Sequence, residues 1–389
     1  MRIVHVANFY GPNSGGIKTT LHELGKGYLK NGHEFIYLVP GTRYRTEDTQ
    51  YGKKISLPSY ILPGSGGYQL IKSNRFLKAE LARLAPDRLE ISDRFTLISV
   101  GGWAKERSIP TVVFSHETLR GLADRFLPNY FPKRAMVNWH NRKLARAFDQ
   151  VIATTEFAAQ EFRDIGISNL AKVPLGVDLQ NFLPSNRCDL MREELLKGAK
   201  YLVVHCSRLS PEKEPQRAIE AVEELIARGV SARLIVIGTG PMWHKLRHRA
   251  AGLPVDYLGY IADRKRVATI LSCADVTMAP GPLETFCLSA LESLASGTPV
   301  IASKSSAVGE FLHSSEINPA GAVADDNGVA FADAIELLLK QPRARESARR
   351  AAEDLPWGNS VQAMLELHGI AELGQLAPTA ATKRRLTAA

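Results

Sequence analysis

Short apolar runs alternate with amphipathic helical patterns along almost the whole of this chain. In the first half, a strand at residues 3–8 precedes a helix whose apolar residues between 17 and 29 share one face, and a second strand covers 34–39. In the second half, a strand at 201–206 and a helix at 216–228 repeat the pattern. Because such alternation builds parallel sheets covered by helices, the sequence predicts an α/β fold.

The length of the chain predicts more than one domain. Its 389 residues exceed what one hydrophobic core normally supports. Residues 180–200 contain only one short helical pattern and are interpreted as a connection between the two alternating halves. We therefore expect two Rossmann-like domains, residues 1–178 and 179–356. The Pro- and Gly-containing segment 53–74 is expected to be a mobile loop.

The composition disfavours several classes of protein. No apolar run approaches the ~20 residues of a membrane-spanning helix, and the N-terminus has the pattern of a strand rather than a signal peptide, so we expect a cytoplasmic protein. The four cysteines have no paired spacing, which argues against a zinc cluster or a disulfide framework. The strand at 34–39 ends without the acidic residue that binds a ribose hydroxyl in nicotinamide enzymes, so that cofactor is not expected.

Positive charge is concentrated in the first half. The net charge is +9, and residues 1–180 hold 25 Lys and Arg against 16 Asp and Glu, which accounts for all of it. Within 119–147, Asp124 is the only acid among basic, apolar and aromatic residues, a composition typical of a segment that contacts anionic lipid. A core helix with a solvated basic face is an equal alternative. Nucleic acid would attract the same charge, but no recognisable module surrounds these aromatic residues and no such partner is expected.

Two carboxylates separated by seven residues bracket a predicted helix start. A helix is expected from Thr285, so that Glu284 and Glu292 would lie about 12 Å apart along its axis, roughly the length of a sugar diphosphate and part of a ribose. The unbonded amides of residues 285–288 would hold an anion between the two acids. An amphipathic helix with a surface glutamate at each end is the simpler alternative.

Further polar residues follow predicted strands. Arg208 and Lys213 lie on a loop at the carboxyl edge of the second sheet, where they would neutralise a diphosphate. His116 follows a strand of the first half in the same way and is a candidate for contact with a reacting sugar. Gly15 and Gly16 would let a phosphate or sugar approach the backbone. Solvated loop charges, a loop-capping histidine and a tight turn without ligand are the corresponding alternatives.

Taken together, these features resemble the retaining glycosyltransferases of family 4, which have the two-domain GT-B fold. The family's Glu-x7-Glu element is matched by Glu284 and Glu292, with Phe286 and Leu288 in the expected places. Residues 174–178 are similar to its Pro-x-Gly-Val-Asp segment. The resemblance covers nearly the whole chain and implies two Rossmann-like domains that face each other across a cleft.

The resemblance also has departures. The family's usual Gly-Arg and Lys-Gly pairs are replaced by Ser207-Arg208 and Lys213-Glu214, which adds an acid beside a proposed phosphate site. No Asp-x-Asp motif occurs in the sequence. The resemblance therefore implies an enzyme that needs no metal ion and no cofactor, in which cations and helix amides stabilise the diphosphate.

The resemblance implies a role for each candidate residue. Glu284 would contact hydroxyls of the donor sugar, Glu292 would hold the ribose, and Arg208 and Lys213 would hold the diphosphate. His116 would line the reacting sugar on the acceptor side. The backbones that would approach the sugar and the distal phosphate are those of Gly15, Gly16, Phe286, Cys287 and Leu288. The backbones that would border the base are those of Leu258, Gly259 and Tyr260.

The reaction implied is transfer of a hexose from a nucleotide-diphosphate sugar to an acceptor hydroxyl with retention of configuration. By analogy with lipid-mannosylating relatives, GDP-mannose is the favoured donor and a UDP-sugar the next. The acceptor would be lipid-linked or anionic, with peripheral contact on the cytoplasmic face of the membrane. A helix at 357–374 would cross back to the first domain, and residues 375–389 are expected to be disordered.

Two other classes of function remain open from the sequence. A nucleotide-sugar epimerase on the same two-domain fold would convert its substrate without an acceptor. A basic adaptor that binds membrane or nucleic acid would turn over no donor at all.

Overall fold

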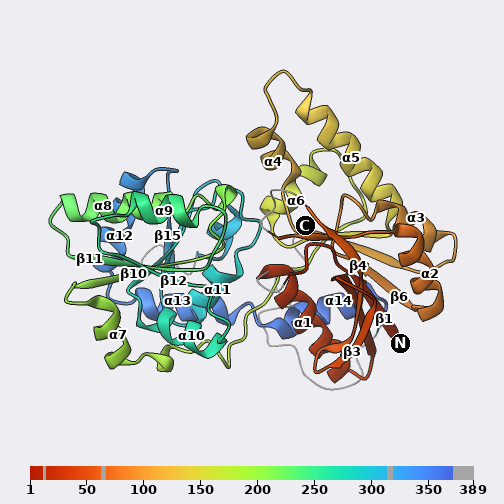
Figure 1. The fold of residues 1–389 in the computed structure, drawn as a ribbon, viewed down its shortest axis with the longest axis horizontal. Helices are drawn as coiled ribbons and strands as arrows, with labels where there is room; N and C mark the ends of the chain where they lie inside the picture. The colour runs from red at the N-terminus through yellow and green to blue at the C-terminus, as the bar shows by residue number, and fades with distance from the viewer. Residues whose placement is uncertain (12–14, 63–66, 313–318, 371–389) are drawn as a thin grey trace, which may run out of the picture.

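The structure is a computed structural model that describes residues 1–11, 15–62, 67–312 and 319–370. Two separate sheets, each covered by helices, lie side by side, with the N-terminal half red to yellow and the C-terminal half green to blue in Figure 1. Most strand pairs in both sheets are parallel. The prediction of an α/β fold is therefore confirmed.

The first sheet is built around β1, which pairs with β2 on one side and β6 on the other. Its strand order is β3-β4-β2-β1-β6-β7-β8-β9, with β5 paired to β4. The strands are β1 (Arg2–Val6), β2 (Glu34–Gly41), β3 (Arg45–Thr49), β4 (Gly52–Ile61), β5 (Gln69–Ile71), β6 (Arg88–Ile91), β7 (Thr111–Ser115), β8 (Gln150–Ala153) and β9 (Leu170–Lys172). The helices of this half are α1 (Gly16–Lys30), α2 (Asn74–Leu84), α3 (Ile98–Lys105), α4 (Leu119–Phe126), α5 (Lys133–Ala147) and α6 (Glu156–Arg163).

The loop predicted at residues 53–74 is wrong over most of its length. Strand β4 runs parallel to β2 and antiparallel to β3, and β5 pairs with its far end. Residues 63–66 lie outside the described residues. Pro58 is tolerated because it lies beyond the pairing with β3, which ends at Ser56, so no β3 carbonyl requires its missing amide hydrogen.

The second sheet has the order β12-β11-β10-β13-β14-β15. This is the Rossmann order, in which the chain starts at the centre, builds to one side and then crosses to the other. The strands are β10 (Tyr201–Cys206), β11 (Ala232–Ile237), β12 (Val255–Gly259), β13 (Val276–Ala279), β14 (Val300–Ser303) and β15 (Gly321–Ala324). The helices are α7 (Asp189–Leu196), α8 (Gln216–Ala227), α9 (Trp243–Arg249), α10 (Arg264–Cys273), α11 (Leu288–Ala295), α12 (Gly328–Leu339), α13 (Ala344–Glu353) and α14 (Trp357–Leu367).

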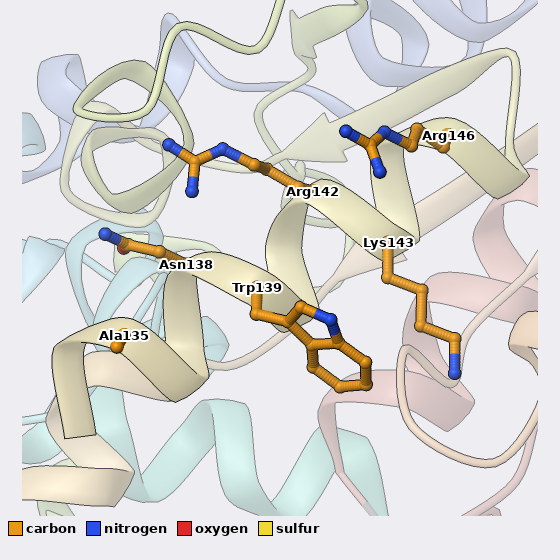
Figure 2. A pocket seen from close by; sticks show the side chains of 6 residues that line it. All are labelled: Ala135, Asn138, Trp139, Arg142, Lys143 and Arg146. Atoms are coloured by element: carbon orange, nitrogen blue, oxygen red, sulfur yellow. The ribbon is translucent and has the colours of Figure 1, made fainter. Parts of the chain in front are cut away.

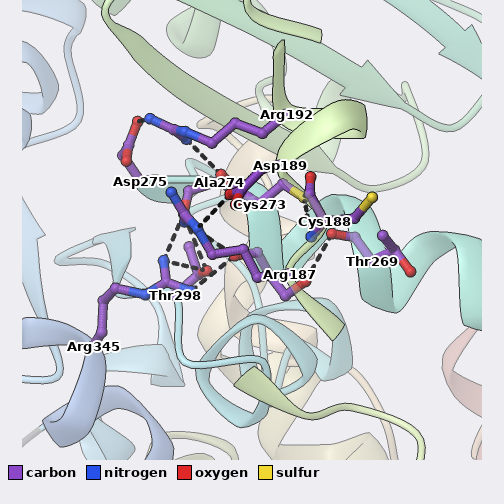
Figure 3. Close-up of polar contacts among 11 residues, drawn as sticks. Arg187, Cys188, Asp189, Arg192, Thr269, Cys273, Ala274, Asp275, Thr298 and Arg345 are labelled. Carbon is purple, nitrogen blue, oxygen red and sulfur yellow. Dashed lines mark hydrogen bonds and ion pairs between the residues drawn. The ribbon is translucent and has the colours of Figure 1, made fainter. Parts of the chain in front are cut away.

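Arginine side chains tie the connection between the sheets to the second core. Arg192 of α7 donates to the Cys273 carbonyl at 2.6 Å and pairs with Asp275 at 2.8 Å (Figure 3). Arg345 of α13 donates to the carbonyl of Ala274 at 2.8 Å. Because these carbonyls lie at the carboxyl end of α10, the two cations satisfy acceptors that the helix leaves unbonded.

Helix α14 returns to the first half of the chain and packs beside α1 (Figure 1). Met364 is fully buried there, and Ser360 donates to the Pro174 carbonyl at 2.7 Å. The boundary predicted between residues 178 and 179 stays a prediction. The tail predicted at 375–389 lies outside the described residues.

Candidate active site

The loops that follow β10 and β13 meet at the switch point of the second sheet. Strand β10 pairs with β11, which follows it in the chain, and with β13, which follows after a crossover. Open α/β sheets bind ligands at the carboxyl edge where the strand order changes direction in this way. The topology therefore brings the predicted cations and the first predicted acid to one place.

Lys213 and Glu284 form an ion pair at this edge. The Lys213 Nζ and Glu284 Oε1 atoms are 2.8 Å apart. Burial disfavours the charge of Lys213, but the Glu284 carboxylate outweighs burial and raises the pKa of Lys213 above its usual value. A Cβ on Gly281 would lie 3.2 Å from the Lys213 Cα, so the two loops approach closely. The site holds a fixed positive charge beside a fixed carboxylate.

Arg208 faces the first half of the chain. Its guanidinium lies over the ring of Tyr68, with 4.3 Å between the guanidinium carbon and the ring centroid. This contact is not predictable from the sequence, because Tyr68 belongs to the segment predicted to be a loop. The second predicted cation is thus held where the two halves of the chain meet.

The helix after Glu284 begins later than predicted. Helix α11 starts at Leu288, three residues beyond the expected start, and its N-cap Cys287 has a left-handed φ of 65°. Thr285 instead contacts the first half, because its carbonyl accepts hydrogen bonds from Thr154 at 3.2 Å and Thr155 at 2.8 Å. The expected axial spacing of about 12 Å does not apply, since Glu284 precedes the helix. The helix amides available to an anion begin at Leu288.

Glu292 is buried within α11 and pairs with Arg264 of α10. The Arg264 guanidinium carbon also lies 4.9 Å from the centroid of the Phe182 ring. The sequence analysis missed Arg264, because only the packing of α10 beside α11 brings it to Glu292. The carboxylate proposed to hold a ribose therefore already has a cationic neighbour.

The segment proposed to border the base lies at the end of β12. Gly259 has a left-handed φ of 70°, and its carbonyl accepts a hydrogen bond of 2.8 Å from the amide of Gly238. Leu258 packs at the margin of the core, and Tyr260 is 47% exposed. The backbone here is fixed while the tyrosine ring faces outward.

Gly15 and Gly16 lie at the amino end of α1. A Cβ built on either residue would meet no heavy atom within 4 Å among the described residues. The glycine pair thus borders open space rather than a packed turn.

His116 follows β7 and lies against the loop that carries Glu284. Its carbonyl accepts a hydrogen bond of 2.5 Å from the Thr285 hydroxyl, and its Nε2 is 2.9 Å from the Ser92 Oγ. Burial, with smaller contributions from nearby cations, lowers the pKa of His116 to about 3. The imidazole is therefore neutral at physiological pH. The structure brings His116 next to the second sheet, as the candidate role requires.

Glu117 is a residue that the sequence analysis did not select. Burial raises the pKa of its carboxyl to about 7, against the opposing effect of Arg94. Strongly shifted pKa values are frequent at functional sites, so Glu117 is a further candidate beside His116. Its position directly after His116 was the available signal.

Exposed basic and aromatic residues gather on α4, α5 and the loop between them, which project from the first half (Figure 1). Tyr130 is 83% exposed and Trp139 is 63% exposed. A core position is therefore the wrong interpretation for these rings. We call this surface the basic tip, and it comprises Arg125, Phe126, Tyr130, Phe131, Arg134, Met136, Trp139, Arg142, Lys143 and Arg146.

One side of α5 within the basic tip is hollowed. A hollow of about 530 Å³ is lined by residues that include Trp139, Arg142 and Arg146. Figure 2 shows Trp139 and Lys143 side by side, with the Lys143 ammonium 5.1 Å from the indole centroid.

Among the described helices, none is long and apolar enough to cross a membrane.

The two parallel sheets, with the candidate residues on loops at their carboxyl edges, have the two-domain architecture of the GT-B class. The family model described as glycosyl transferases group 1 matches residues 187–355, and the model described as glycosyltransferase family 4 matches residues 14–181. The chain is 43% identical over 375 residues to the GDP-mannose-dependent alpha-(1-6)-phosphatidylinositol dimannoside mannosyltransferase of Mycobacterium tuberculosis, covering 95% of this chain and 96% of that one. This protein therefore belongs to the group 1, family 4 glycosyltransferases.

Solved structures confirm the fold. The sucrose-phosphate synthase of Thermosynechococcus elongatus matches with a TM-score of 0.75 and 19% identity, over 95% of this chain and 98% of that one. Anabaena HepE in complex with UDP and glucose matches with a TM-score of 0.74 and 16% identity, over 94% and 99% of the two chains. The resemblance inferred from the sequence is confirmed at the level of family and of GT-B fold.

Proposed function

We propose that this protein transfers mannose from GDP-mannose to a lipid-linked acceptor of the phosphatidylinositol mannoside type, with retention of configuration and without a metal ion. The observation that carries the proposal is the 43% identity over 95% of the chain to a mannosyltransferase with that donor and that class of acceptor. A similarity this extensive includes both halves of the cleft, and not the donor-binding half alone.

The cations at the switch point support chemistry without a metal ion. Lys213, Arg208 and the amino end of α11 provide positive charge where a diphosphate would lie. Preorganised donors of this kind stabilise the charge that develops on a leaving group, and each typically contributes about 3 kcal/mol. They would replace the divalent ion that other nucleotide-sugar enzymes use.

Retention is favoured by the way in which Glu284 is held. Because Lys213 pairs with Glu284 at 2.8 Å, this carboxylate is suited to bind sugar hydroxyls rather than to attack the anomeric carbon. The diphosphate would then leave on the face where the acceptor hydroxyl attacks. It would take the hydroxyl proton as the new glycosidic bond forms. His116 would contact the sugar from the acceptor side.

A lipid-linked acceptor also fits the basic tip. Exposed Tyr130 and Trp139 rings among Arg and Lys side chains have the composition of a surface that binds anionic headgroups and inserts shallowly. Such contact would hold the cleft next to the membrane surface that contains the acceptor. We therefore include peripheral membrane binding at the cytoplasmic face in the proposal.

The test is to incubate the purified full-length protein with a panel of GDP- and UDP-sugars, with and without phosphatidylinositol mannosides in mixed micelles. We expect GDP release from GDP-mannose that depends on the acceptor, an α-linked product by proton NMR, and unchanged rates in EDTA. Sugar conversion without acceptor would instead identify an epimerase. Absence of turnover with every donor would favour the adaptor, and a β-linked product would contradict retention.

A further inference from the structure

A chain of buried polar side chains runs behind His116. The His116 Nε2 is 2.9 Å from the Ser92 Oγ, which is 2.8 Å from the His5 Nε2. The His5 Nδ1 is in turn 2.7 Å from the Glu90 Oε2. Ser92, His5 and Glu90 are each at most 1% exposed. We call these three residues the buried relay.

The strand register holds the buried relay in place. His5 on β1 lies opposite Glu90 on β6, so their side chains share one face of the sheet. Ser92 follows β6 directly, and His116 follows β7, which pairs with β6. The pairing of adjacent parallel strands thus places the four polar side chains within hydrogen-bonding distance of one another.

Glu90 is the fixed end of the relay. Besides His5, it accepts hydrogen bonds from the Tyr28 hydroxyl at 2.6 Å and from the Nε2 of His368, beyond α14, at 2.7 Å. Burial opposes ionisation, but the hydrogen bonds from His368 and His5 outweigh it and lower the pKa of Glu90 to about 2. Glu90 is therefore an ionised carboxylate, which accepts hydrogen bonds but cannot donate one.

The hydrogen bonds along the relay start from this carboxylate. Because Glu90 only accepts, the His5 Nδ1 donates to it. The Ser92 hydroxyl lies between the Nε2 atoms of His5 and His116 and has one proton, so it donates to one ring and accepts from the other. The Ser92 hydroxyl therefore sets whether the Nε2 of His116 is protonated, and with it the state of the His116 Nδ1.

Aromatic stacking fixes the plane of the same ring. The Phe114 ring stacks on His116 with centroids 5.7 Å apart at 7°, and on His5 with centroids 5.6 Å apart at 22°. Rotation of the imidazole would break both the stacking and the bond to Ser92. The ring is held in one plane and one tautomer by neighbours that do not reach the cleft.

We propose that Ser92, His5 and Glu90 are positioning residues that fix the plane and the tautomer of the His116 imidazole, so that its Nδ1 presents one defined hydrogen-bonding group to a hydroxyl of the bound sugar. The proposal rests on the proposed function for its kinetic consequence alone. It also connects the C-cap of α14 to the relay, because His368 bonds to Glu90.

The kinetic test compares Ser92→Ala with Ser92→Thr, which keeps the hydroxyl. Loss of a residue that orients a catalytic side chain typically lowers activity about 10-fold to 100-fold. We expect Ser92→Ala to lower kcat for mannose transfer by that factor with little change in the KM for GDP-mannose, and Ser92→Thr to recover most of it. In a His116→Ala background, Ser92→Ala should have no further effect, because the two residues act as a unit. Ser347→Ala, a buried serine on α13, is the control expected to keep wild-type kcat.

The direct test is nitrogen NMR of histidine-labelled protein, in which His116→Gln assigns one of the ten histidines. We expect a single tautomer of His116 in the wild type and a mixture of tautomers in Ser92→Ala. A mixture of tautomers in the wild type, or no change in the variant, would overturn the proposal even if mannose transfer is confirmed. If no donor is turned over, the proposed function fails and the NMR result alone decides on the relay.

Discussion

At the residue scale, Lys213 is the side chain whose loss we expect to lower activity most. Its charge is held in place by Glu284 before any phosphate arrives, so no reorganisation is needed as the leaving group develops charge. We expect Lys213→Ala to lower kcat by about 100-fold to 1000-fold, roughly 3 to 4 kcal/mol of barrier, and Arg208→Ala to act in the same direction. Steady-state rates of GDP release measure this.

The matched control for Lys213 is Lys197→Ala. Lys197 pairs with Asp256 at 3.0 Å but lies on the exposed surface. Its loss should leave kcat unchanged, since an exposed ion pair contributes about 0 to 1 kcal/mol to stability and Lys197 does not face the cleft. Circular dichroism would show that all variants are folded. Wild-type turnover in both Lys213→Ala and Arg208→Ala would refute their assignment to the diphosphate.

Glu214 occupies a position where related enzymes usually have glycine, and its backbone explains why. Its φ is 45°, a left-handed conformation that costs a residue with a Cβ about 1 kcal/mol or more. Its carboxylate offsets part of this cost by pairing with Arg125, which comes from α4 in the other half of the chain. The acid that the sequence placed beside the phosphate site is thus directed to the first domain.

This balance predicts the effect of Glu214→Gly. Glycine would remove the strain but also the ion pair, whose contribution is up to about 1 kcal/mol. Ser108 has a φ of 54° on the exposed surface, so Ser108→Gly removes strain alone. We expect Ser108→Gly to raise the free energy of unfolding by about 1 kcal/mol, and Glu214→Gly to raise it less. Thermal and urea unfolding measure both. An equal or larger gain from Glu214→Gly would exclude a stabilising Arg125 pair.

At the element scale, the basic tip on α4 and α5 predicts membrane binding. Burying one aromatic side chain in the interface contributes roughly 1.5 to 3 kcal/mol, so we expect Trp139→Ala to weaken binding to phosphatidylinositol-containing vesicles by about 10-fold to 100-fold. Binding should also weaken as salt screens the Arg and Lys side chains. Vesicle sedimentation measures the bound fraction.

The control for the basic tip is Leu190→Ala on α7. Leu190 is 80% exposed but belongs to the second half of the chain, away from the basic tip. Its loss should not change vesicle binding. Equal binding by Trp139→Ala and the wild type, or equal binding to anionic and zwitterionic vesicles, would contradict a membrane role for this surface.

Elements were predictable where local pattern decides them. The strands β1, β2, β10 and β11 and the helices α1 and α8 follow from apolar periodicity, and the loops after them carry the predicted cations and glycines. The start of α11 was not predictable. Thr285 is held out of the helix by Thr154, Thr155 and the His116 carbonyl, contacts that join residues more than a hundred positions apart.

The same limit applies to candidate residues. His116, Arg208 and Lys213 were found because each follows a strand at the carboxyl edge, and Glu284 because it and Glu292 bracket a predicted helix start. Their roles stay proposals. The partners that hold them were not found. Arg264 reaches Glu292 from a neighbouring helix, and Ser92 reaches His116 from a neighbouring strand, so only the packing of the elements places them together.

At the scale of the whole molecule, α14 links the end of the chain to the first domain and to the relay behind His116. Val361 packs against the backbone of α1 at Gly27, where a Cβ would come within 2.2 Å of a Val361 methyl carbon. Arg88 donates to the His368 carbonyl at 2.9 Å, while the His368 ring bonds to Glu90. A displacement of α14 would therefore disturb both the first core and the buried relay.

Gly27→Ala tests this arrangement against a matched glycine. Alanine in a helix is favoured by about 1 kcal/mol over glycine, and Gly102→Ala on α3 should show this gain because a Cβ there meets no heavy atom of the described residues within 4 Å. At Gly27 the added methyl overlaps Val361, and overpacking of this kind costs about 1 to 3 kcal/mol. We expect Gly27→Ala to lower the midpoint of urea unfolding and to speed hydrogen exchange in α14. It should also lower kcat, because His368 is displaced. Gly102→Ala should raise the midpoint of urea unfolding and leave kcat unchanged. If Gly27→Ala were as stable and as active as Gly102→Ala, α14 would have to be free to shift without effect on either the core or the relay.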